Sequence, residues 1–253
     1  QAMWVARALA ASRSSSASGL TCSKKFFSSV PPKKGFIELR QYDIAPFGVK
    51  DYLHETSQAA NVRKELFASS GSRWLGFFTT EIGGNLNRMF HMYWYQDYET
   101  RDQIRAKVAS NEAWKTYLNK VKPFMIEQNN MVFLEATDVL KNAGLKGALE
   151  YQSPSSKTLV SYELRRYQLK LGYHIVPQFL NSYGRGLPDK LNADDSGAST
   201  LVTLLYSDCG TLNTVVELWR HESIERSQDS RKASRNAEGW KKSIAEIADI
   251  ANS

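Results

Sequence analysis

The sequence is poor in cysteine and contains no long hydrophobic run. Only two cysteines, Cys22 and Cys209, occur among 253 residues, and two thiols cannot build a disulfide framework. No CxxC or Cys/His spacing indicates a metal site. No apolar stretch approaches the roughly 20 residues that a membrane-spanning helix needs. A disulfide-rich secreted domain, a zinc module and a helical membrane protein are therefore excluded as classes.

Acidic residues are missing from the beginning of the chain, where the first is Glu38. The first 27 residues carry four basic side chains, so more than half of the formal net charge of +7 belongs to this segment. The rest of the chain contains no block of lysine and arginine comparable to a basic arm. The high pI therefore gives little support to nucleic-acid binding.

Residues 1–30 have the composition of a mitochondrial transit peptide, being rich in Ser and Ala, basic and free of acids. Their first apolar residues can form one stripe of a helix: Met3, Trp4, Val5 and Leu9. Lys25-Phe26-Phe27 before Ser28 resembles a matrix-protease cleavage site. A disordered, Ser-rich tail is the alternative. We favour import, and predict a mitochondrial protein, most simply of the matrix.

An internal repeat fixes the domain organisation. The segment ELRQY at residues 38–42 recurs as ELRRY at 163–167, an offset of 125. GNLN at 84–87 recurs as GTLN at 210–213, and EAWK at 112–115 recurs as EGWK at 238–241, both at an offset of 126. Three matches in the same order predict a duplicated unit. We expect the first unit at 35–136, a linker at 137–157 and the second unit at 158–253.

Each unit has the periodicities of an α+β fold. In the first, alternation predicts strands at 36–44, 74–81, 87–95 and 131–135, with helical spacing at 47–69 and, in two pieces, at 98–122. This β-α-β-β-α-β order is that of the ferredoxin-like unit. The fold class we predict is two tandem ferredoxin-like units forming a pseudo-dimeric α+β barrel.

The second unit repeats the order but stops early. Strands are expected at 159–169, 200–206 and 213–219, and helices at 175–191 and up to 250. Pro177 and Gly184 predict that its first helix is weak or interrupted. A fourth strand would begin after the last residue, so either the sequence is truncated or the unit lacks this strand and leaves an unpaired sheet edge, a site of association unless it is covered.

The repeated motifs resemble those of the NIPSNAP family. The resemblance rests on the openings at 36–42 and 162–167, on Gly84-Asn85-Leu86-Asn87 leading into Phe90–Trp94, and on the Trp114 helix. It implies a mitochondrial location and a barrel closed by two ferredoxin-like units. It also implies a link to mitochondrial quality control (mitophagy) and to binding of autophagy machinery. No enzymatic activity is established for the family.

Strand alternation gives a candidate site. Ile37 and Leu39 should pack under the helices, because the face of a sheet that carries helices is normally apolar. The polar and aromatic residues of the opposite face should then converge inside the barrel: Glu38, Arg40, Tyr42, His91, Tyr93, Glu163, Arg165, Tyr167, Glu217 and Trp219. A small-molecule pocket, with His91 as base or haem ligand, is one interpretation. Cross-strand ion pairs of Glu38 with Arg40 and of Glu163 with Arg165, filling the layer between the two sheets, are the interpretation we favour.

Three functions follow as hypotheses. The first is a non-enzymatic binding or adaptor protein without a cofactor, whose partners are mitochondrial or autophagy-related proteins or a second copy at the open edge. The alternative is a dimeric α+β-barrel enzyme or a haem or small-ligand binder that uses the inter-sheet pocket. The third is contact with an anionic membrane surface through basic helix faces, which contain Arg101, Arg105, Lys107, Arg226, Arg231, Lys232 and Arg235. Nucleic acid and metal are not expected as ligands.

Overall fold

The first unit follows the predicted order of strands and helices. The computed structural model describes residues 2–8, 35–68, 70–152 and 160–252. The elements of unit one are β2 (Phe36–Ile44), α1 (Val49–Gln58), α2 (Ala60–Ala68), β3 (Arg73–Ile82), β4 (Arg88–Tyr95), α3 (Tyr98–Ser110), α4 (Glu112–Val121) and β5 (Met125–Glu135). The two-piece helix is confirmed. Asn111 is extended, and its side chain accepts a hydrogen bond from the backbone N–H of Trp114 (2.9 Å), which starts α4 with a side-chain cap.

The second unit repeats the order of the first as far as its second pair of helices. Its elements are β6 (Ser161–Gln168), α6 (Ile175–Ala193), β7 (Ser199–Cys209), β8 (Thr214–His221), α7 (Ile224–Ser234) and α8 (Glu238–Ala248). A short helix, α5 (Thr137–Asn142), lies in the predicted linker.

The prediction that the first helix of unit two is interrupted is wrong, because α6 is continuous over 19 residues. Pro177 lies in its first turn, where a backbone N–H has no partner within the helix. A Cβ added at Gly184 would lie at ordinary contact distance from Val139 of α5. Neither residue therefore removes a contact that the helix needs.

All described strands join one closed barrel in the order β1-β3-β4-β2-β5-β7-β8-β6, with antiparallel pairing throughout. The place of the missing fourth strand, between β6 and β3, is taken by β1 (Ala2–Ala8). The edge that we expected to be unpaired is therefore covered. The helical stripe expected for Met3, Trp4 and Val5 is wrong for the same reason. The expected cleavage site at 25–27 lies outside the described residues.

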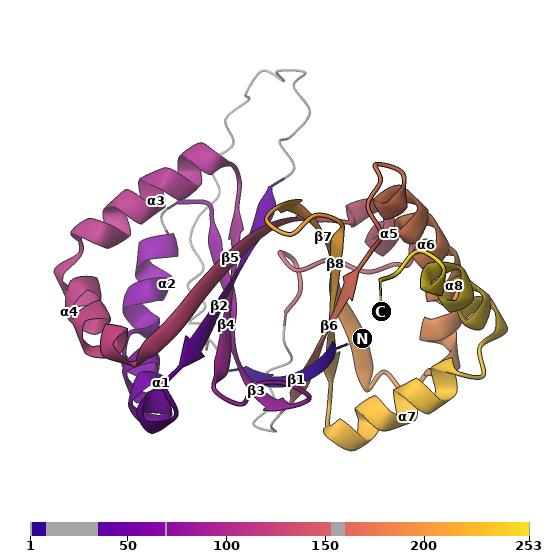
Figure 1. Ribbon diagram of the computed structural model, residues 1–253, viewed down its shortest axis with the longest axis horizontal. Helices are drawn as coiled ribbons and strands as arrows, with labels where there is room; N and C mark the ends of the chain where they lie inside the picture. Colours follow the sequence, from indigo (N-terminus) through magenta and orange to yellow (C-terminus); the bar gives the residue numbers. More distant parts are fainter. Residues whose placement is uncertain (1, 9–34, 69, 153–159, 253) are drawn as a thin grey trace, which may run out of the picture.

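The two units face each other across the barrel and carry their helices on the outside. Figure 1 shows α1–α4 covering one side and α6–α8 the other. Because neighbouring strands alternate in direction around the ring, β2 and β6 run the same way, and both finish at the end that carries the β3–β4 and β7–β8 turns. We call this the turn end of the barrel. Backbone bonds from Ile44 to Asn87 (3.0 Å) and from Leu169 to Asn213 (2.9 Å) mark it in the two units.

The opposite end is closed by the segment after α5. Ala148 and Tyr151 pack against the hydrophobic cluster inside the barrel. The backbone N–H of Ala148 donates to Glu135 Oε1 (2.7 Å), and Arg73 Nη1 donates to the carbonyl of Leu149 (2.8 Å). Both contacts hold the segment against the strands, so the barrel interior is accessible mainly from the turn end.

Candidate functional site: a cavity inside the barrel

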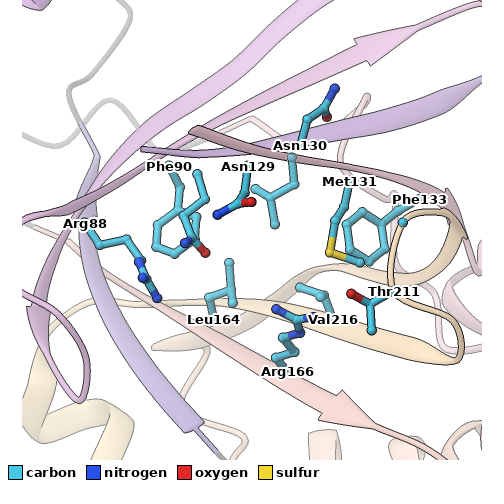
Figure 2. Close-up of a pocket in the computed structure, with 13 residues that line it drawn as sticks. Arg88, Phe90, Asn129, Asn130, Met131, Phe133, Leu164, Arg166, Thr211 and Val216 are labelled. Atoms are coloured by element: carbon cyan, nitrogen blue, oxygen red, sulfur yellow. The ribbon is translucent and has the colours of Figure 1, made fainter. Parts of the chain in front are cut away.

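A cavity of about 610 Å³ lies between the two sheets towards the turn end. Figure 2 shows its lining side chains, which come from β2, β4 and β5 of unit one and from β6, β8 and the β7–β8 turn of unit two. The lining consists of Leu39, Gln41, Arg88, Phe90, Asn129, Asn130, Met131, Phe133, Leu164, Arg166, Gly210, Thr211 and Val216. Its volume is in the range of small-molecule sites.

The cavity is apolar in its depth and polar at its mouth. Phe90, Phe133, Leu164 and Val216 are buried and belong to the hydrophobic cluster that joins the two units. Polar side chains follow at the turn end: Gln41, Arg88, Asn129, Arg166 and Thr211. Strand alternation explains this order, because Leu39 and Gln41 on β2, like Leu164 and Arg166 on β6, are successive residues of the inward face.

Two arginines from opposite sheets lie at the mouth. Arg88 donates two hydrogen bonds to the carboxylate of Asp43, each of 2.6 Å. The side chain of Arg166 makes no hydrogen bond or ion pair with any other residue in the described ranges. Partial burial lowers its pKa, and the positive charge of Arg88 lowers it further. At Arg88 the charges of Asp43 and Glu127 raise the pKa, whereas no acidic side chain of the described residues acts on the pKa of Arg166.

The ten predicted site residues do not line this cavity, and their expected position inside the barrel is wrong. Glu38, Arg40, Tyr42, His91 and Tyr93 lie beneath the helices of unit one, where partners from α1, α2 and α3 contact them. Their counterparts in unit two lie beneath α6 and α7: Glu163, Arg165, Tyr167, Glu217 and Trp219. The alternation itself was predicted correctly. The assignment of its two faces was reversed, since both faces of a closed barrel covered by helices are buried.

In unit one, the polar face forms an ion-pair cluster and a caged cation. The fully buried Glu38 contacts Arg40 and accepts a hydrogen bond from Arg101 Nε of α3 (2.5 Å). Burial opposes ionisation of Glu38, but these two arginines outweigh it and lower its pKa. Arg63 of α2 lies over Trp74 and Trp114, each with its guanidinium carbon 5.0 Å from the ring centre. Such cation–π contacts stabilise a charge that water cannot reach.

His91 is not available as a base or haem ligand. Its Nδ1 lies 2.8 Å from Arg63 Nη1, and its Nε2 lies 3.4 Å from the Tyr52 hydroxyl. Burial, and after it the charges of Arg63 and Arg40, hold its pKa well below the usual value, so the ring is neutral. A neutral imidazole whose Nδ1 accepts from an arginine is a structural hydrogen-bonding group. These residues do not fit a haem at this position.

Unit two places a carboxylate where unit one has His91. Glu217 is fully buried and accepts hydrogen bonds from Tyr167 Oη (2.5 Å), Trp219 Nε1 (2.6 Å) and the Tyr183 hydroxyl. Lys190 of α6 lies over the rings of Trp219 and Trp240, at 4.0 and 4.5 Å. Burial lowers the pKa of Lys190 to about 8 although the charge of Glu217 opposes the shift. Lys190, which the sequence analysis did not single out, takes the role of Arg63.

The second ion-pair cluster of unit two surrounds Glu163. Its carboxylate accepts from Arg165 Nε (2.7 Å) and lies 3.0 Å from His221 Nε2 and 3.3 Å from Arg231 Nη1 of α7. The Glu–Arg motifs form ion pairs in both units, but the prediction of cross-strand pairs between the sheets is wrong, because each pair joins residues i and i+2 of one strand and lies beneath the helices. Arg101 and Arg231, expected on basic helix faces that contact a membrane surface, instead point inward to Glu38 and Glu163.

Nowhere in ranges 2–8, 35–68, 70–152 and 160–252 do three His, Cys, Asp or Glu side chains gather as a metal site. Within the same ranges, no helix is both long and apolar enough to cross a bilayer. The polar cavity residues that sequence reasoning missed are Gln41, Arg88, Asn129, Asn130, Arg166 and Thr211. Gln41 lies two residues after Leu39 on β2, and Arg166 lies two residues after Leu164 on β6, so each shares the inward strand face of the leucine before it. This alternation was the signal that could have found Gln41 and Arg166.

Comparison with known proteins gives the chain its relatives. Protein NipSnap homolog 3B of Mus musculus is 28% identical over 202 residues, which span 79% of this chain and 71% of the mouse protein. Protein NipSnap homolog 3A of Homo sapiens is 24% identical over 201 residues, with the same coverage. A crystal structure from Fusobacterium nucleatum, described as a candidate monooxygenase, is 13% identical with a TM-score of 0.56 and covers 87% of this chain and 88% of its own. That identity shows the fold alone. The NIPSNAP family profile matches residues 37–140 and 162–252, and so both units: the chain belongs to the NIPSNAP family.

Proposed function

We propose that this NIPSNAP-family chain is a mitochondrial binding protein that holds a small molecule in its barrel cavity and does not transform it. The observation that carries the proposal is the cavity of about 610 Å³ with an apolar depth and a polar mouth. None of the described residues lining it is His, Cys, Asp, Glu, Lys or Tyr. Because general acid–base catalysis needs such a group at the substrate, the lining favours binding over chemistry.

A neutral fluorescent probe tests the cavity directly. We expect N-phenyl-1-naphthylamine to bind the full chain saturably, with enhanced emission and a ratio of one to one. The substitution Val216→Phe should weaken binding about tenfold, because it places a ring in the apolar depth. Val108→Phe on α3, outside the cavity, is the matched control and should bind as the wild type does. Emission that rises without saturation, or that is equal in both variants, would refute a cavity site.

The mitochondrial location rests on the acid-free, Arg- and Ser-rich first 30 residues and on the family resemblance. Cleavage after Phe27 would remove β1 from the barrel. The same segment therefore cannot be both a cleaved leader and a strand of the mature barrel. Mass spectrometry of the protein recovered from mitochondria decides between them. A mature chain that begins at Ser28 supports a cleaved leader, and a protein found only outside mitochondria would refute the location.

An adaptor role in mitochondrial quality control is a second candidate, favoured by exposed apolar side chains at the turn end. They occupy related places in both units: Phe47, Leu86 and Ile126, then Leu171, Tyr173 and Leu212, with exposures from 61% to 103%. Exposed apolar clusters commonly contact other proteins.

Affinity purification from mitochondria tests this role. A partner should be retained by the wild type and by Ile224→Ser, and lost with combined Phe47→Ser, Leu86→Ser and Leu212→Ser. The same set of bound proteins in all three samples would count against the adaptor role.

A further inference from the structure

The cavity is graded along the barrel axis from apolar to positively charged. Its depth is formed by buried residues of both units, among them Phe90, Phe133 and Leu164. Its mouth contains Arg88 from β4 and Arg166 from β6, which Figure 2 shows on opposite sides of the same space. A ligand that satisfies both regions has an apolar body and one polar end.

The charge at the mouth selects the sign of that polar end. Arg88 is bound by Asp43 through two hydrogen bonds of 2.6 Å, so the carboxylate of Asp43 is already engaged. Arg166 faces the cation of Arg88 and has no acidic partner in the described part of the chain. A guanidinium presents five donors in a planar fork that matches a carboxylate or phosphate. An anion between the two arginines would give the Arg166 guanidinium a negatively charged partner.

Neutral polar groups complete the mouth. Gln41 and Asn129 place carboxamides on the unit-one side, where the Asn129 amide nitrogen donates to Glu127 Oε1 (2.8 Å), and Thr211 places a hydroxyl on the unit-two side. Gln41 and Arg166 occupy equivalent repeat positions, so only one of the two units supplies the extra charge at this layer. The site is therefore asymmetric although the barrel is built from repeats, which suits a ligand with a single head group.

From this arrangement we infer that the cavity takes an amphipathic anion, whose acidic head contacts Arg166 and Arg88 and whose apolar body lies between the sheets. The inference rests on the proposed cavity function and deepens it. Water reaches the mouth, so the charge contact is weaker than in a closed site, and about a tenfold preference for the anion is expected.

Calorimetric titration of the full chain with three twelve-carbon probes tests the inference: dodecanoate, dodecan-1-ol and dodecyltrimethylammonium, each below its micelle concentration. Dodecanoate should bind about tenfold more tightly than the alcohol, and the ammonium probe should bind most weakly. Hexanoate should bind less tightly than dodecanoate, because less apolar surface is buried.

Substitution at the mouth assigns the contact. Arg166→Gln should remove the preference for dodecanoate over dodecan-1-ol, whereas Arg166→Lys should retain part of it. Arg226→Gln, at an exposed arginine of α7, is the matched control and should leave both affinities unchanged. Circular dichroism and thermal melting of each variant confirm that the fold is intact.

The outcomes separate the two proposals. Equal affinity for dodecanoate and dodecan-1-ol, unchanged in Arg166→Gln, would overturn the anion inference and leave the cavity site standing. Failure of all probes, together with failure of the neutral dye, would overturn the cavity function itself. Tight binding that Val216→Phe does not weaken would place the ligand elsewhere and refute both.

Discussion

Glu217 offers the sharpest test of the reasoning on buried charge. It has no exposed surface, accepts three hydrogen bonds from Tyr167, Tyr183 and Trp219, and lies 3.4 Å from Arg165 Nη1. Burial opposes its ionisation, but Lys190, Arg165 and the tyrosine hydroxyls outweigh burial and lower its pKa. The carboxylate is therefore charged, and Lys190 depends on it for compensation.

The substitution Glu217→Gln removes this charge and turns an amide NH₂ towards groups that donate. Breaking a buried pair from one side costs about 3–5 kcal/mol, because the remaining charge stays buried without compensation. For a chain of this size, each kcal/mol lowers Tm by about 2–4 °C. We therefore expect Tm to fall by about 6–20 °C. The defect should be smaller at pH 9 than at pH 7, because Lys190, with its pKa near 8, sheds its buried charge as pH rises.

Urea unfolding, followed by tryptophan fluorescence and circular dichroism, measures the free energy of unfolding. Lys190→Met in the Glu217→Gln background should recover much of the loss, since the two effects are coupled. Glu238→Gln on the surface of α8, where Lys241 is the partner, is the control and should change stability by less than about 1 kcal/mol. A Glu217→Gln protein within about 1 kcal/mol of the wild type, or two losses that simply add, would refute the reasoning.

Three further predictions concern other parts of the barrel. The pKa of Glu163 is lowered to about 2 from about 4.5, so the stability that its charge contributes is complete above pH 4.5 and disappears as pH falls towards 2. The substitution Glu163→Gln should lower the free energy of unfolding by about 3 kcal/mol at pH 7 and flatten the acid-unfolding curve. An unchanged curve would contradict this. Val5→Pro should destabilise the barrel by about 1–3 kcal/mol relative to Val5→Thr, because Val5 pairs with both Ile82 and Glu163; equal melting of the two would mean that β1 does not close the barrel. Gly186→Ala should lower the free energy of unfolding by about 1–3 kcal/mol, because its Cβ would lie 2.5 Å from Ser243 Oγ. Gly184→Ala should be tolerated, because its Cβ would lie 3.6 Å from Val139. Melting curves that rank the two variants in the reverse order would be inconsistent with the α6–α8 contact.

The order of elements could be predicted from the sequence because it depends on local patterns and on comparison of the chain with itself. The strand at β2 was predicted at its observed bounds, and the α3–α4 break was expected from the first unit alone. β5 was predicted from residue 131, but it begins at Met125. The polar segment at its start lacks the apolar alternation that marks a half-buried strand.

The candidate site could be predicted only in part. The Glu38–Arg40 and Glu163–Arg165 pairs follow from an i, i+2 spacing on one face of a strand. The donors that complete these clusters come from helices distant in sequence, such as Arg63 and Lys190. Nothing in the local pattern says which helix residue will lie above a given strand residue, so these partners could not be named.

By itself the sequence determined that two similar units exist and which residues share a strand face. Tertiary structure alone decided which face lies under the helices, because both faces are buried and only packing distinguishes them. It also decided that β1 fills the gap between β3 and β6, since strand edges have no sequence code for their partner. The cavity with Arg88 and Arg166 arises in the same way, from side chains that only closure of the barrel brings together.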